Sequence, residues 1–267
     1  MDTPPDHRPT AALLRLALDE SDEDQAWTAV VALHHRGTRE VLEAARQLCQ
    51  PAQGAHARRV GADILGQLGV PQRSFPDECL EILLEAWARE QEEDVLHAIA
   101  VALGHLKDPR AIAPLSRGAT HPSARVRYGV VFGLLTHTAD LAVHTLIQLS
   151  QDSDELVRDW ATFGLGTQID LDTPAIRDAL AARLTDADPT TRIEACKGLL
   201  KRQDERLVAA VQRELSAPSD DDTLVEALIL AIGVADPRLY PAVRALPERE
   251  PLIPWIADAL AACRGSG

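Results

Sequence analysis

A ten-residue segment that recurs along the chain constrains the fold more than any other feature of the sequence. Its clearest copy, Val157–Gly166, reads VRDWATFGLG, and related copies span Val126–Leu135 and Thr191–Leu200. Weaker copies end at His34, Gly66, Gly104 and near Gly233. Successive copies are therefore roughly 31 to 38 residues apart, a period typical of helical solenoids, in which each repeat packs on its neighbours.

Each copy follows a shorter stretch whose apolar residues recur every three or four positions, which predicts an amphipathic helix before it. These first helices of the repeats are expected at Ala111–Ala119, Leu141–Ser150, Pro174–Leu184 and Glu205–Ser216. Prolines, whose missing N–H costs nothing at a helix start, are expected to open first helices at Pro71, Pro109, Pro174 and Pro237. Side-chain oxygens near the start of the second helices predict N-caps at Asp24, Ser123, Asp154, Asp188 and Asp222.

Composition agrees with a helical repeat architecture. Hydrophobic residues make up 46% of the chain and charged residues 25%, which is typical of a folded protein, and the 3% of aromatic residues favours helix over sheet. We predict an all-α fold, a right-handed α-solenoid of about eight antiparallel helix pairs. No Gly/Ser linker divides the chain, so residues 10–264 are expected to form one domain between a flexible N-terminal tail, 1–9, and a C-terminal tail, 265–267.

Two segments resemble a known repeat family. Leu103–Leu115, which reads LGHLKDPRAIAPL, resembles the junction of HEAT repeats, especially those of the bacterial phycobilisome-lyase type. The pattern Val-Arg-x-x-Ala-x-x-Gly-Leu-Gly of Val157–Gly166 is similar to the core of such a repeat. The resemblance covers most of the chain, from about Thr10 to Cys263, and implies HEAT-type helix pairs. It implies little about function, because such repeats serve scaffolds, lyases, hydroxylases and glycosylases alike.

The negative charge of the chain narrows the class of partner. A net charge of −14 and a pI near 5.0 count against a nucleic acid or an anionic membrane as the main partner and would attract a basic one. No apolar run approaches the ~18 residues that a membrane span needs. We therefore predict that the partner is another protein with a basic surface, and we expect no nucleic acid and no membrane.

The cysteines bear on the compartment. Cys49, Cys79, Cys196 and Cys263 are far apart and form no CxxC pair, so we expect buried, reduced thiols rather than disulfides or a zinc site. The N-terminal residues lack the apolar stretch of a signal peptide, and the predicted location is the cytoplasm. Only three lysines accompany many arginines, a bias compatible with a GC-rich bacterial genome.

Residue patterns of common enzyme classes are absent from the sequence. It contains no GxSxG, Walker loop, GxGxxG or HExxH motif, and no His-Glu dipeptide like those that hold iron in deoxyhypusine hydroxylase, a HEAT-repeat enzyme. His137, Asp140 and His144 lie close in sequence and have metal-ligand side chains, but a polar turn explains them better. We predict a protein that is not an enzyme and that needs no metal or cofactor.

Charged residues recur at fixed places in the repeats. Arg127, Arg158 and Arg192 follow acidic turns, which predicts a ladder of Asp–Arg contacts between neighbouring repeats. Acidic turns at 19–24, 90–94, 152–155, 186–188 and 220–222 are expected to form a discontinuous acidic ridge on one edge of the solenoid. His34 and His35 are interpreted as cations that complement the end of a second helix.

Aromatic residues gather in two adjacent second helices. Phe132 and Phe163 occupy the same repeat position, which holds Asp63 and Lys197 elsewhere and is therefore interpreted as facing solvent. Core packing is the competing explanation for such rings. If they are exposed, they form an aromatic strip on the concave face, where they can anchor a partner. The predicted partner-binding residues are Tyr128, Phe132, Trp160, Phe163, Asp159, Asp63, His97, Glu194 and Lys197.

These features favour a non-catalytic scaffold that binds a partner protein on its concave face. A narrower form of this hypothesis is a bacterial immunity or inhibitor protein that covers a basic toxin. The alternative is a HEAT-repeat enzyme that resembles a bilin lyase or a DNA glycosylase, to which Asp159 and Trp160 invite comparison. A glycosylase must neutralise phosphates, for which this acidic chain is poorly suited.

Overall fold

The computed structural model describes residues 6–19, 21–218, 220–246 and 252–264, and all regular secondary structure in these ranges is helical. The all-α prediction is confirmed for these residues. The chain clusters into two compact units, Met1–Thr145 (unit 1) and Leu146–Gly267 (unit 2). The single domain proposed for residues 10–264 stays a prediction. Residues 1–5 and 265–267 of the predicted tails lie outside the described residues. Within the described part of the N-terminal tail, the carbonyl oxygens of Asp6 and Arg8 accept hydrogen bonds from Arg36.

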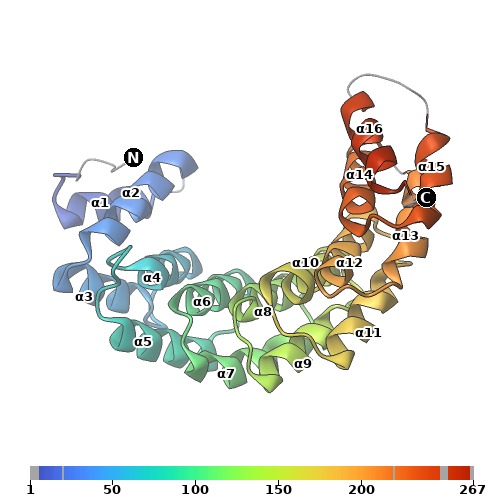
Figure 1. Ribbon diagram of the computed structural model, residues 1–267. Helices are drawn as coiled ribbons and strands as arrows, with labels where there is room; N and C mark the ends of the chain where they lie inside the picture. The colour runs from blue at the N-terminus through green and yellow to red at the C-terminus, as the bar shows by residue number, and fades with distance from the viewer. Residues whose placement is uncertain (1–5, 20, 219, 247–251, 265–267) are drawn as a thin grey trace. The chain divides into compact units, whose positions relative to one another are not determined.

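Unit 1 is built from helix pairs in two layers (Figure 1). The first helices of the pairs are α1 (Thr10–Ala17), α3 (Arg39–Leu48), α5 (Pro76–Arg89) and α7 (Ile112–Arg117), the last flanked by the 3-10 turns η1 (Pro109–Ala111) and η2 (Gly118–Thr120). The second helices are α2 (Glu23–Arg36), α4 (Ala55–Gln67), α6 (Glu93–Leu106) and α8 (Ala124–Leu134). They lie side by side, with α4 between α2 and α6 and α6 between α4 and α8. We call this row the second-helix layer of unit 1.

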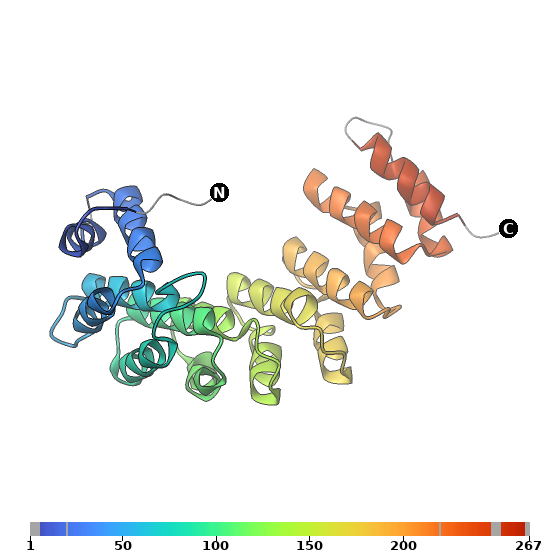
Figure 2. The same cartoon turned by 60° about the vertical axis from the view of Figure 1, so that its left-hand side comes forward.

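Unit 2 repeats the same arrangement (Figure 2). Its first helices are α11 (Pro174–Arg183), α13 (Leu207–Ser216) and α15 (Tyr240–Arg244), the last preceded by the turn η4 (Pro237–Leu239). Its second-helix layer consists of α10 (Glu155–Phe163), α12 (Pro189–Lys201), α14 (Asp221–Val234) and α16 (Ile253–Ala262). Neighbours in this row pack on one another, and α10 continues into a π-helical turn, η3 (Gly164–Gln168). Helix α9 (Asp140–Leu149) contains the boundary between the units.

Close contact between second helices depends on glycine. A Cβ atom at Gly104 of α6 would lie 2.8 Å from the carbonyl oxygen of Phe132 in α8. In unit 2, a Cβ at Gly198 of α12 would lie 2.6 Å from the Cα of Gly166 in η3. Real Cβ atoms do not approach backbone this closely, so packing between repeats explains these glycines, which otherwise weaken a helix.

The helix boundaries correct several expected caps. Asp154 and Asp188 cap α10 and α12 as predicted, and Ser123 holds the N-cap position of α8 without a side-chain hydrogen bond. The caps predicted at Asp24 and Asp222 are wrong. Helices α2 and α14 begin earlier and are capped by Asp22 and Asp220. The acidic residues after these caps complement the helix dipole instead.

The expected proline positions are correct in part. Pro174 opens α11, while Pro109 and Pro237 open the short 3-10 turns η1 and η4 that precede α7 and α15. The helix start predicted at Pro71 is wrong, because α5 begins only at Pro76 and Pro71 lies in the turn before it.

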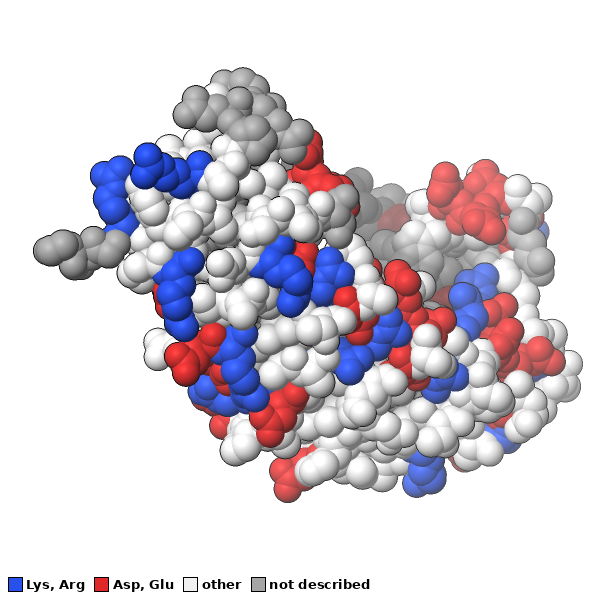
Figure 3. All heavy atoms as spheres, turned by 90° about the vertical axis from the view of Figure 1, so that its right-hand side faces the viewer, with Lys and Arg blue, Asp and Glu red and all other residues white. Residues whose placement is uncertain are grey.

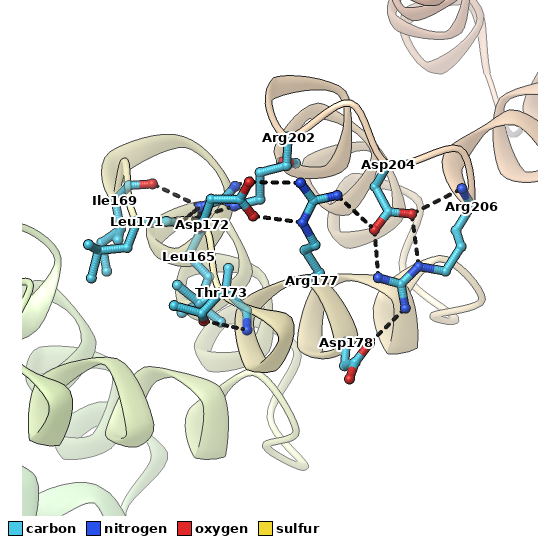
Figure 4. Close-up of polar contacts among 12 residues, drawn as sticks. Leu165, Ile169, Leu171, Asp172, Thr173, Arg177, Asp178, Arg202, Asp204 and Arg206 are labelled. Carbon is cyan, nitrogen blue, oxygen red and sulfur yellow. Dashed lines mark hydrogen bonds and ion pairs between the residues drawn. The ribbon is translucent and has the colours of Figure 1, made fainter.

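A buried arginine fixes the end of α10 in unit 2 (Figure 4). The side chain of Arg202, at 5% exposure, donates to backbone carbonyl oxygens of five residues, Leu165, Gly166, Ile169, Leu171 and Gly198. Four of these carbonyls lie in η3 or just after it and the fifth, that of Gly198, lies in α12, so the bonds hold the segment that leads to α11 against α12. Next to it, Arg177 pairs with Asp172 and Asp204.

Candidate functional site

The second helices of unit 1 present equivalent positions to one face. In unit 1 the N-cap residues of α2, α4, α6 and α8 are Asp22, Gly54, Glu92 and Ser123. Counted from these caps, the fifth residues are Trp27, Arg59, His97 and Tyr128, and the ninth are Val31, Asp63, Val101 and Phe132. In α10, α12 and α14 of unit 2 the ninth residues are Phe163, Lys197 and Ile229. Of the seven ninth-position side chains, six are partly exposed and Ile229 is exposed, so solvent reaches this position in each of these helices.

In unit 1, three predicted site residues form one aromatic cluster. The imidazole of His97 stacks parallel to the ring of Tyr128, with centroids 5.7 Å apart, and Tyr128 meets Phe132 edge-on at 5.1 Å. The His97 Nδ1 lies 3.1 Å from the carbonyl oxygen of Arg125, which fixes the imidazole against α8. Burial lowers the pKa of His97, so the neutral ring is favoured in this cluster.

Also in unit 1, a pocket of about 630 Å³ opens on the second-helix layer. Its lining includes Trp27 and Val30 from α2, and Arg59 and Asp63 from α4. Trp27 is 52% exposed, the largest exposed fraction of any aromatic side chain among the described residues. Burial raises the pKa of the Asp63 carboxyl to about 6, although the nearby Arg59 opposes the rise.

A buried histidine joins two of these pocket residues. The Trp27 indole meets the His34 imidazole edge-on, with centroids 6.2 Å apart, and His34 Nε2 lies 2.9 Å from the carbonyl oxygen of Asp63. Burial lowers the pKa of His34 to about 4. The expectation that His34 is a cation at a helix end is therefore wrong, because the ring is buried and neutral at pH 7.

In unit 2, two predicted aromatic residues pack on each other. The rings of Trp160 and Phe163 meet edge-on at 5.5 Å, and both side chains are partly exposed. Tyr128 and Phe132 in unit 1 are partly exposed as well. The rings therefore lie between the two predicted extremes, with neither the full burial of core residues nor the exposure of Trp27. They can still contact a partner through their exposed edges.

In the described part of the chain, Asp159 has a polar atom without a hydrogen-bond partner. Its Oδ1 is buried and has no hydrogen-bond partner among the described residues. Burial raises the pKa of its carboxyl to about 6, and the negative charges of Asp188, Glu194 and Glu155 raise it further. A donor supplied from outside would stabilise this oxygen.

The other two predicted residues in unit 2 pair with each other. Lys197 Nζ lies 3.2 Å from a carboxylate oxygen of Glu194 on α12 and equally far from one of Glu226 on α14. This bridge between neighbouring second helices gives both residues a structural role on the same face.

The predicted ladder of Asp–Arg contacts between repeats is present in part. Arg158 pairs with Asp186 at 2.8 Å, whereas Arg192 pairs with a glutamate, Glu214, at 2.7 Å. Arg127 donates to backbone carbonyls of its own turn, His121 and Pro122. Arg58, which was not among the predicted residues, pairs with Glu90 at 2.7 Å from the same place in α4.

Many carboxylates of the expected acidic ridge are engaged within the protein, as helix caps or as partners of arginines. Asp22, Asp154, Asp188 and Asp220 accept backbone N–H groups as helix caps. Although burial opposes it, the bonds from Arg58 and Arg158 hold the pKa values of Glu90 and Asp186 below normal. On the face shown in Figure 3, acidic and basic side chains are interspersed rather than gathered into one acidic surface.

The remaining candidates for chemistry have ordinary surroundings. All four cysteines are buried and free, as predicted, and burial raises the pKa values of their thiols. Among the described residues, no cluster of three or more His, Cys, Asp or Glu side chains has a metal-binding arrangement. His144 Nδ1 lies 2.7 Å from the carbonyl oxygen of Asp140, one turn earlier in α9. No helix in the described ranges is both long and apolar enough to cross a membrane.

The structure thus groups the predicted site residues into separate sets. His97, Tyr128 and Phe132 form one cluster, Trp160 contacts Phe163, and Glu194 contacts Lys197. Asp63 belongs instead to the pocket beside Trp27, a residue that the sequence analysis did not select. The available signal was its position, because Trp27 follows its N-cap at the same interval as Tyr128 and His97.

Comparison with known proteins agrees with the fold. A family model described as HEAT repeats matches residues 143–233. Protein YibA of Escherichia coli K12 is 25% identical over 222 residues, which cover 80% of this chain and 78% of YibA.

Two solved structures show the same helical architecture. The X-ray structure of E. coli YibA aligns over 97% of this chain and 93% of its own, with a TM-score of 0.76 at 24% identity. Kap95p, solved with RanGDP, aligns over 95% of this chain and 39% of its own, with a TM-score of 0.61 at 13% identity. The specific likeness to phycobilisome-lyase repeats stays a prediction. Residues 143–233 therefore match the HEAT-repeat family, and the chain is similar to YibA in sequence and in fold.

Proposed function

We propose that this protein is a non-catalytic scaffold that binds another protein through its second-helix layers. The binding residues are those predicted from the sequence, together with Trp27 and its pocket. The proposal places the protein in the cytoplasm, which its four free, buried cysteines favour. The right-handed superhelix of about eight helix pairs is part of the same proposal.

The observation that carries the proposal is the choice of side chains at the solvent-facing positions. Of nine aromatic residues in the chain, Trp27, Tyr128, Phe132 and Phe163 occupy fifth or ninth positions of second helices. A surface position needs no aromatic ring for folding, and rings that stay partly exposed are costly in water. Aromatic side chains on a preformed surface are instead typical anchors of protein interfaces.

Two further points support a protein as the partner. A similar fold in Kap95p binds RanGDP, another protein. The net charge of −14 disfavours nucleic acid and attracts basic surfaces. In its narrower form, the proposal is an immunity or inhibitor protein that covers a basic toxin.

The proposal is tested by copurification from the native host with tagged full-length protein. A specific partner should be recovered with the wild type and lost with the Tyr128→Ala/Phe163→Ala double variant. Leu141→Ala and Leu156→Ala are matched controls, because both leucines are exposed and neither is a proposed binding residue. Equal recovery with the double variant and the controls would contradict the assigned face. A partner that proves to be nucleic acid would contradict the function.

A further inference from the structure

The pocket of unit 1 has the composition of a site for a cation. Four carboxylates, Asp19, Glu23, Asp63 and Asp94, and two arginines, Arg59 and Arg125, line it beside Trp27. Arg125 is engaged by Asp94 in an ion pair. The remaining charges are therefore three carboxylates against Arg59, so the pocket carries an excess of negative charge close to an exposed indole.

Trp27 is held in place without being covered. Its ring packs edge-on against the buried His34, and His34 is fixed in turn by the backbone carbonyl of Asp63. The indole still exposes 52% of its surface. Because His34 is buried and neutral, the support behind the indole adds no positive charge that would repel a cation. Indoles bind cations over the ring face more strongly than other aromatic groups do.

Asp63 has spare capacity to accept hydrogen bonds. Its ion partner is Arg59, one turn away on the same helix at 3.6 Å, and no described residue donates a hydrogen bond to its carboxylate. The side chain is only 20% exposed, so water compensates it poorly. An additional donor that enters the pocket would gain a charge-assisted hydrogen bond in partly desolvated surroundings.

We propose that this pocket takes an arginine side chain of the partner protein, with the guanidinium stacked on Trp27 and donating to Asp63. The inference rests on the proposed function and specifies the chemistry of its partner. Arginine fits both groups at once, because its planar guanidinium stacks on an aromatic face and presents several N–H donors to a carboxylate. The volume of about 630 Å³ also accommodates the backbone that flanks such a side chain.

The test uses the full chain and a blocked pentapeptide with one central arginine between glycine and serine residues. The readout is the indole N–H resonance of Trp27, assigned by replacing each of the four tryptophans with phenylalanine in turn. A saturable shift in about the millimolar range is expected, the strength of a single side-chain contact. A peptide with citrulline, the neutral isostere of arginine, should bind at least about tenfold more weakly.

Variants of the pocket assign the two contacts. Trp27→Ala and Asp63→Asn should each weaken arginine-peptide binding at least about fivefold, measured for Trp27→Ala by the backbone amides of α4. The matched controls are Trp255→Ala, another exposed tryptophan, and Asp24→Asn, an exposed acid of α2 outside the pocket lining. The controls should bind like the wild type.

Several outcomes would overturn the inference. It fails if the citrulline and arginine peptides bind equally, if Trp255 responds in place of Trp27, or if Asp63→Asn binds like the wild type while its thermal transition shows it to be folded. These results leave the broader function testable, because neither Tyr128 nor Phe163 lines this pocket, so the Tyr128→Ala/Phe163→Ala variant tests the binding face separately. Loss of the partner in that variant, with no arginine binding in the pocket, would reject the inference alone.

Discussion

Both units place aromatic rings and acidic side chains on their second helices, yet the surroundings of these side chains differ. In unit 1, Asp63 lines an open pocket beside Trp27, and its charged neighbour on α4 is Arg59. In unit 2, Asp159 is surrounded by the carboxylates of Asp188, Glu194 and Glu155, and the adjacent Trp160 packs on Phe163.

The difference shows that the repeat fold does not fix the surroundings of a given surface position. The helix register decides which positions face the layer, but the side chains of neighbouring helices decide whether a given position becomes a pocket wall or a packed surface. Unit 1 therefore offers an open pocket to a cationic group, while unit 2 offers the exposed edges of Trp160 and Phe163 to apolar contact.

The largest expected effect concerns the arginines that hold the ends of second helices. Arg202→Ala should destabilise unit 2 by about 3–5 kcal/mol, because it leaves several buried carbonyl oxygens without a donor. Arg73→Ala in unit 1 should cost about 1–2 kcal/mol, since Arg73 is less buried and donates to Gly66 and His105 only. Hydrogen exchange of the amides in η3 and in α4 measures each loss locally. Equal losses would remove this difference between the units.

A smaller difference in stability is expected between substitutions of Trp160 and of Trp27. Trp160→Ala should lower the free energy of unfolding by about 2 kcal/mol, since a partly buried ring packed on Phe163 is lost. Trp27→Ala should change it by less than about 0.5 kcal/mol, because half of that ring is already in water. Urea denaturation of both variants checks this pair. A loss of more than about 3 kcal/mol for Trp160→Ala would show that the ring is core and would remove it from the binding face.

The smallest effect is the pH dependence of Asp63. Its pKa is raised from 3.8 to about 6 in the folded protein, so folding favours the protonated form. The contribution of this group to stability is present below pH 4 and is lost as the pH rises through 4 to 6. Asp63→Asn should therefore be more stable than the wild type by about 1–2 kcal/mol at pH 7, and the gain should vanish below pH 4.

Asp159 provides the comparison for this titration. Asp159→Asn should give a gain of the same sign and of about the same size, because burial raises the pKa of both carboxyls to about 6 and a neighbouring arginine opposes the rise in each case. The titration of His34 changes the free energy of unfolding in the opposite sense. Subtracting the wild-type value from that of each variant at the same pH removes this contribution. The pKa of His34 is lowered to about 4, so its contribution is present above pH 6.5 and lost on acidification. A gain that does not depend on pH would contradict the assignment to Asp63.

Much of the fold could be predicted because its signals are local. The repeat at Val157–Gly166, the helix starts at Pro174 and Asp188, and the burial of the four cysteines all follow from spacing and side-chain chemistry within one repeat. The pairing of Arg158 with Asp186 was also accessible, because it joins equivalent places in successive repeats. Trp27 and Arg58 were missed although each occupies a repeat position whose equivalents in other helices had been selected.

The sequence by itself determined the helical repeat and the positions that face the second-helix layer, because periodicity and capping act over a few residues. Only the tertiary structure decided that Asp63 and Trp27 share a pocket, that His34 is neutral, and that Arg202 is buried among carbonyl groups. These outcomes depend on side chains about 30 residues apart in sequence and on the distance between packed helices, which sets their desolvation. Local patterns contain no measure of that distance.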